Sequence, residues 1–168
     1  MEIKISTYDF FNKFILGLVF VGVLLLSYFN DVNLILQELG DINNNAIIVS
    51  IFSFSALAVV YETGIIINRL GSLLEEALKF FHLIPFNKDY KRFNDKKKEY
   101  PIMVTLSREY ASSRNSIILF ALISIIVFIK FCWFGFMPLC IMLLFYYSCR
   151  KYAKKICALM VSIRRSTY

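Results

Sequence analysis

Residues 46–85 read AIIVSIFSFSALAVVYETGIIINRLGSLLEEALKFFHLIP, an apolar stretch followed by an amphipathic one. As a helix, 46–68 is about 33 Å long at about 1.5 Å per residue, which matches the roughly 30 Å hydrocarbon core of a bilayer. From Leu70 onward, apolar residues recur every three or four positions until Pro85, which cannot continue a helix. The segment therefore predicts one helix that crosses a membrane and continues past it.

Further apolar stretches extend this pattern over a chain of 168 residues that is 58% hydrophobic. One is 14–29, and two lie between Arg114 and Arg150. A single long span is the competing interpretation of that second region, but Gly135 and Pro138 at its centre favour a turn. The sequence therefore predicts an all-α polytopic membrane protein with four transmembrane helices.

The charges of the connecting segments predict the topology. Linker 30–45 carries acidic residues and no Lys or Arg, and its part 32–39 predicts a short interfacial helix. Segment 69–115 contains ten Lys or Arg and the chain after Cys149 contains six, whereas the turn between the last two spans carries only Lys130. Because basic residues stay on the cytoplasmic side, both termini are expected in the cytoplasm.

Four segments follow from this topology. They are a transmembrane hairpin over 1–68 with spans at about 14–29 and 46–68, a cytoplasmic helical hairpin with a basic tip over 69–115, a second transmembrane hairpin over 116–149, and a basic cytoplasmic tail over 150–168. Pro101 suits the first turn of a helix and is expected to open the second arm of the cytoplasmic hairpin.

Basic residues near the spans are candidates for contacts with anionic lipid of the inner leaflet or with a protein partner. They are Lys88, Lys91, Arg92, Lys96, Lys97, Lys98, Arg108, Arg114, Arg150, Lys151, Lys154 and Lys155. A solvated positive loop explains these charges better than direct binding of nucleic acid does. The cytoplasmic hairpin exceeds what topology requires, and ordering it costs conformational entropy, so it is expected to dock a soluble cytoplasmic protein.

An ionisable residue and two glycines in the second span are candidates for oligomerisation and helix packing. Glu62 lies two turns before Arg69, with Asn68 nearby, and could form a polar belt in an oligomeric bundle. The alternative is an interfacial Glu that pairs with Arg69, Arg114 or the tail. Gly64 and Gly71 are seven residues apart and predict a seam for close packing within or between subunits.

Nothing in the sequence has the pattern of a catalytic, cofactor or metal site. His82 is the only histidine, the four cysteines lack close paired spacing, and the glycines are scattered. The chain is therefore expected not to be an enzyme and to hold no cofactor.

The layout resembles that of small four-span proteins encoded in bacterial anti-phage defence loci, such as the membrane subunit of Kiwa systems. The resemblance lies in YDFF at 8–11, in a second span that runs into INRLGS at 67–72, and in a helix with Arg108 and Arg114 that enters the third span. It implies a homo-oligomeric platform in the bacterial inner membrane that senses phage-induced perturbation and recruits a nucleic-acid-binding effector.

Two classes of function remain open. In the first, the protein is an anchor and sensor whose short third and fourth spans respond to the bilayer. In the second, it is a pore-forming effector or small channel, with Glu62 and Asn68 at the mouth. The apolar spans favour the anchor, because a conducting path needs polar lining. A secondary transporter is third, since no inverted repeat is evident.

Overall fold

The computed structural model describes residues 7–28, 46–85 and 100–166 of the chain. In this part of the chain every regular element is helical, which confirms the all-α prediction. The elements are α1 (Thr7–Ser27), α3 (Ala46–Phe80), α5 (Pro101–Phe131), the short 3-10 helix η2 (Cys132–Gly135) and α6 (Phe136–Ser166). The predicted helix at 32–39 and the basic tip with Lys88, Lys91, Arg92, Lys96, Lys97 and Lys98 lie outside the described residues.

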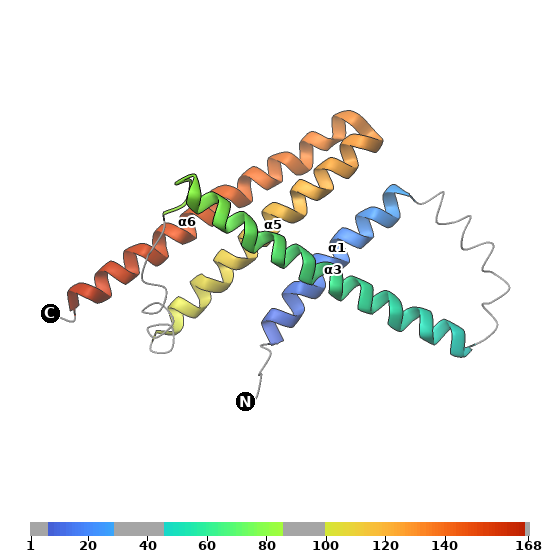
Figure 1. The fold of residues 1–168 in the computed structure, drawn as a ribbon, viewed down its shortest axis with the longest axis horizontal. Helices are drawn as coiled ribbons and strands as arrows, with labels where there is room; N and C mark the ends of the chain where they lie inside the picture. The colour runs from blue at the N-terminus through green and yellow to red at the C-terminus, as the bar shows by residue number, and fades with distance from the viewer. Residues whose placement is uncertain (1–6, 29–45, 86–99, 167–168) are drawn as a thin grey trace.

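Three stretches of the described chain are long and apolar enough to cross a membrane. Two of them are single helices, Thr7–Ser27 and Ser50–Phe80. The third, Pro101–Ser162, consists of α5, η2 and most of α6. It is folded back on itself, so that α5 and α6 lie antiparallel (Figure 1).

The long helix that the quoted segment predicts is confirmed, since α3 is continuous over 35 residues. It ends at Phe80, five residues before Pro85, where His82 has a positive φ of 56°. The amide of Leu83 then donates to the carbonyl of Leu78, which closes the end of the helix. α5 begins at Pro101 as predicted, because its missing N–H is not needed in the first turn.

Two boundaries differ from the prediction. α1 starts at Thr7, ahead of the predicted span, and its first turn contains Asp9, whose charge favours a helix N-terminus. The turn between the last two apolar helices falls at Cys132–Gly135 rather than at 135–138. Pro138 lies inside the first turn of α6, where proline is tolerated.

Two clusters of buried side chains hold the helices together. Ile117 of α5 packs with Cys149 and Ala153 of α6 and with Leu78 of α3. The rings of Phe120 and Phe145 stack between α5 and α6 with their centres 5.5 Å apart. These contacts attach the end of α3 to the α5–α6 pair.

The second cluster lies where α3 crosses α1 and α5 (Figure 1). Leu16 of α1, Ile67 of α3, and Leu119 and Ile123 of α5 are its buried members. α3 crosses the other helices steeply and its first half extends away from them (Figure 1). The amphipathic part of α3 is only partly covered, since Leu78 is buried while Leu73 and Phe80 are exposed.

Candidate functional site

Polar side chains from α3 and α5 meet inside the helix bundle. We call this cluster the polar junction, and its members are Asn68 and Glu75 of α3 and Arg114 and Asn115 of α5. Each residue comes from a helix that also contributes to the apolar clusters, so the packing of those clusters fixes the position of the polar groups.

The hydrogen bonds of the polar junction form one continuous chain. Arg114 Nη1 donates to Glu75 Oε2 at 2.5 Å. Arg114 Nε also donates to Asn115 Oδ1 at 3.3 Å, and Asn115 Nδ2 donates to Asn68 Oδ1 at 2.8 Å. Lys79, one turn beyond Glu75, forms a second ion pair with the same carboxylate. The junction therefore links two points on α3, two turns apart, to adjacent residues of α5.

The polar junction is largely shielded from its surroundings. Asn115 is 0% exposed, and the side chains of Arg114 and Glu75 are 12% and 17% exposed. A half-buried ion pair gains from the low local dielectric but loses hydration, so its net contribution is modest while loss of one partner is costly. The junction therefore constrains how α3 can lie on α5.

Glycine makes the close approach at the junction possible. A Cβ atom at Gly71 would collide with Asn115 Oδ1. Gly64, two turns earlier, lies against the backbone of Lys13, and Gly17 of α1 lies against the backbone of Val60. The predicted glycine seam of Gly64 and Gly71 is thus used within one chain, by α1 and by α5 in turn.

The structure separates the predicted oligomer residues into two groups. Asn68 and Gly71 take part in the polar junction, and Gly64 in the crossing with α1. Glu62 and Arg69 are exposed and face away from these contacts. Arg114, one of the partners considered for Glu62, pairs with Glu75 instead, because the crossing of α3 and α5 brings residue 75 to it.

Three residues of the packing were not singled out from the sequence. Glu75 occupies a polar position between the apolar residues that recur after Leu70, and Asn115 follows Arg114 at the start of an apolar stretch. A polar residue at such a border is a signal for an internal hydrogen bond. Nothing in the sequence distinguishes Gly17 from Gly22, which has open space around it.

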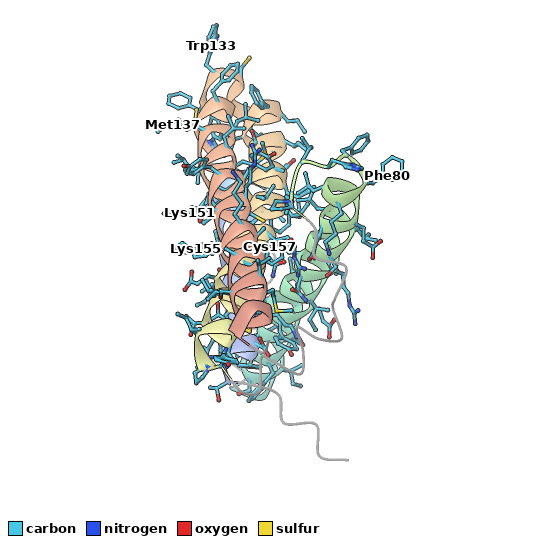
Figure 2. The ribbon with its side chains drawn as sticks, turned by 90° about the vertical axis from the view of Figure 1, so that its left-hand side faces the viewer. Phe80, Trp133, Met137, Lys151, Lys155 and Cys157 are labelled. Atoms are coloured by element: carbon cyan, nitrogen blue, oxygen red, sulfur yellow. The ribbon has the colours of Figure 1, made fainter. Side chains whose placement is uncertain are left out.

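Apart from Arg114, which pairs with Glu75 in the polar junction, the basic candidates on the described helices lie at the surface. Arg150, Lys151, Lys154 and Lys155 are exposed on α6, and Figure 2 shows Lys151 and Lys155 pointing outward from it. Arg108 of α5 lies over the ring of Tyr8 of α1, 4.9 Å from its centre. Arg150, Lys151, Lys154 and Lys155 thus lie on the same helix as the apolar residues that follow Phe136.

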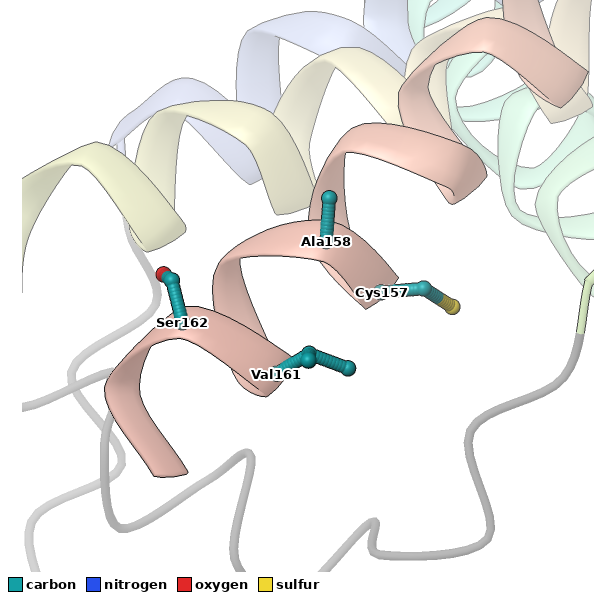
Figure 3. A pocket seen from close by; sticks show the side chains of 4 residues that line it. All are labelled: Cys157, Ala158, Val161 and Ser162. Carbon is teal, nitrogen blue, oxygen red and sulfur yellow. The ribbon is translucent and has the colours of Figure 1, made fainter. Parts of the chain in front are cut away.

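A hollow of about 500 Å³ lies beside the second half of α6, lined by Cys157, Ala158, Val161 and Ser162 (Figure 3). The thiol of Cys157 is 3.8 Å from the carbonyl oxygen of Pro85. Four residues line the hollow and its surface is mostly apolar, with the Cys157 thiol and the Ser162 hydroxyl as its polar side-chain groups. Among the described residues, no three His, Cys, Asp or Glu side chains are grouped closely enough to hold a metal ion.

No protein-family model, curated protein or solved structure matches this chain.

Proposed function

We propose that the protein is a non-enzymatic anchor and sensor in the bacterial inner membrane. In this proposal the chain crosses the bilayer four times, through α1, α3, α5 and α6, with both termini in the cytoplasm. It assembles as a homo-oligomer and recruits or regulates a soluble effector at its basic cytoplasmic surface, in anti-phage defence.

The polar junction is the observation that best supports this proposal. It joins α3 to α5 between their apolar stretches and the segments that carry the basic residues. Cys149 of α6 packs in the adjoining apolar cluster. A tilt of α3 in the membrane would therefore move Glu75 and Arg114 together. Such a connection is what a sensor needs to pass a change in the bilayer to a docking surface.

A short apolar face gives the sensor its sensitivity to the bilayer. Between Phe136 and Arg150, α6 offers about 21 Å of apolar helix at about 1.5 Å per residue, against a core of about 30 Å. Lys151 and Lys154 must then extend toward the headgroups, or the bilayer must thin around them. A change in bilayer thickness thus shifts the balance of forces on α6.

The first experiment tests membrane insertion and sidedness. Reporter fusions after Ser27, Phe80, Gly135 and the last residue should report periplasm, cytoplasm, periplasm and cytoplasm, and the chain should stay in the membrane after a carbonate wash. A reporter at Phe80 and one at the C-terminus on opposite sides would refute the four-span topology.

The second experiment tests effector docking. Purification in mild detergent should recover a soluble partner with the wild type and lose it when Arg150, Lys151, Lys154 and Lys155 are all changed to Gln. Glu109→Gln, an exposed change on α5, is the control and should retain the partner. Recovery of the wild-type chain alone under several mild detergents would contradict the anchor.

A pore is the second candidate function, since Glu62 is an exposed charge within an apolar helix. Against it, Asn68 and Asn115 bond to each other rather than lining an open path. Expression of the chain alone discriminates the two: an anchor should leave the membrane potential unchanged, whereas loss of potential that Glu62→Gln abolishes would favour the pore.

A further inference from the structure

The outer face of α3 carries an apolar residue at every seventh position. These residues are Phe52, Val59, Ile66, Leu73 and Phe80, and each is between 57% and 78% exposed. The opposite face contains Val60, Gly64, Ile67 and Gly71, which are buried against α1 and α5. Residues 50–59 are exposed on every side, so the uncovered face is distinct only from Val60 onward, where Ile66, Leu73 and Phe80 oppose the buried residues.

Polar residues fill the intermediate positions of this outer face. They are Ser55, Glu62, Arg69 and Glu76, and all four are exposed. The nine positions alternate in steps of three and four, so they lie along one face of the helix. We call this set of nine residues the α3 seam.

Lipid alone does not satisfy the α3 seam. Acyl chains would solvate Val59, Ile66 and Leu73, but a carboxylate and a guanidinium exposed to hydrocarbon are costly and normally find partners. Within the part of the chain that the structure describes, neither Glu62 nor Arg69 forms an ion pair. Their charges are opposite and they lie at nearly equal distances on either side of Ile66.

We propose that a second copy of this chain covers the α3 seam, through a two-fold contact centred on Ile66. The two-fold axis makes the contact self-complementary, so Glu62 of one copy meets Arg69 of the second copy and the reverse pair forms on the other side. The contact therefore lies at the middle of the α3 seam, around Ile66.

The tilt of α3 favours this arrangement. Copies inserted in the same direction share a two-fold axis along the membrane normal, so upright helices would place Glu62 next to its own equivalent. α3 crosses α1 and α5 steeply (Figure 1), so α3 is strongly tilted in a bilayer that those two helices cross upright. Two strongly tilted helices cross at Ile66 and bring residue 62 of one toward residue 69 of the other.

This inference rests on the membrane location in the proposed function but not on a soluble effector or a role in defence. The charge pair gives its first test. Glu62→Arg and Arg69→Glu should each raise the dimer dissociation constant by about tenfold or more, because each places like charges together. The double exchange Glu62→Arg/Arg69→Glu should restore the wild-type value, and Glu109→Arg on α5 should leave it unchanged.

Association is measured by mass photometry and by light scattering of the full chain in detergent and in lipid nanodiscs. A monomeric wild type, single variants that associate like the wild type, or a double exchange that fails to restore association would each overturn the proposal. Membrane fractionation of the same variants shows whether a variant has lost association or has failed to insert into the membrane.

The centre of the contact gives a second test that needs no charge change. With Cys132, Cys140 and Cys157 changed to Ser, Ile66→Cys should form a disulfide-linked dimer on mild oxidation, since residue 66 meets its own equivalent on the axis. Leu57→Cys, also exposed on α3 but away from the seam, is the matched control. Cross-linking of Leu57→Cys equal to that of Ile66→Cys would overturn the centre proposed here.

Discussion

The ammonium of Lys130 lies 4.0 Å from the centre of the Tyr28 ring, which joins the end of α5 to the end of α1. Arg108 and Tyr8 make the matching contact at the other ends of the same two helices, 4.9 Å apart. From Tyr8 to Tyr28 is about 30 Å along a helix, the thickness of a bilayer core. Aromatic and cationic residues thus mark both limits of the apolar surface of this pair.

These limits predict the depth of the only tryptophan. Trp133 is 81% exposed at the turn after α5, close to Lys130 in sequence. In vesicles, lipids brominated near the headgroup should quench its fluorescence more strongly than lipids brominated at the chain end. Equal quenching by both, or access of aqueous acrylamide as to free tryptophan, would contradict an interfacial position.

The ion pair of the polar junction predicts a loss of stability in one variant. Glu75→Ala removes the acceptor of both Arg114 and Lys79 and leaves a mostly shielded guanidinium unpaired. The free energy of unfolding should fall by about 2 kcal/mol. Thermal unfolding in detergent measures it, with Glu109→Ala, an exposed change on α5, as the control that should differ little from wild type.

Three glycines inside helices, Gly22, Gly64 and Gly71, test the close approaches at the crossings of α3. Gly71→Ala should destabilise by about 2 kcal/mol, because a methyl group collides with Asn115, and Gly64→Ala by a similar amount through the backbone of Lys13. Gly22→Ala meets open space and should stabilise the helix by up to about 1 kcal/mol. Chemical unfolding measures the free energy of unfolding of the three variants. The same change for all three would refute the close approaches.

The turn before α6 stores backbone strain at one position. Cys132 has a φ of 43°, a conformation that glycine adopts without a steric penalty. Cys132→Gly should therefore raise the melting temperature, and Cys132→Val should lower it, because a β-branched residue is disfavoured there. Equal melting temperatures for the two variants would show that the positive φ carries no cost.

The sequence predicts the helices far better than it predicts their contacts. The continuity of α3 follows from its periodicity, and the start of α5 follows from Pro101, since both depend on local backbone chemistry. The pairing of Glu75 with Arg114 depends on the crossing of two helices, and no local rule gives the position of that crossing. The sequence therefore singles out Glu62 within its apolar span, whereas the buried ion pair is formed by Glu75.

The same limit applies to the faces of α3. Leu73, Ala77 and Leu78 belong to one predicted apolar stripe, yet only Leu78 is buried, because α5 and α6 cover one edge of the stripe. Periodicity identifies a surface that avoids water, but it does not say whether protein of the same chain, lipid or another copy covers it.

The connection Cys132–Gly135 also bears on how the protein is synthesised. Because only the four residues of η2 join them, α5 and α6 cannot settle in separate places after they leave the ribosome. Their contacts are local along the chain, so the pair can close as soon as both have been translated, and early closure satisfies the carbonyl of Gly135 through the hydroxyl of Ser124 at 2.7 Å. In the proposed four-span topology, α5 and α6 would therefore enter the membrane together as a closed pair.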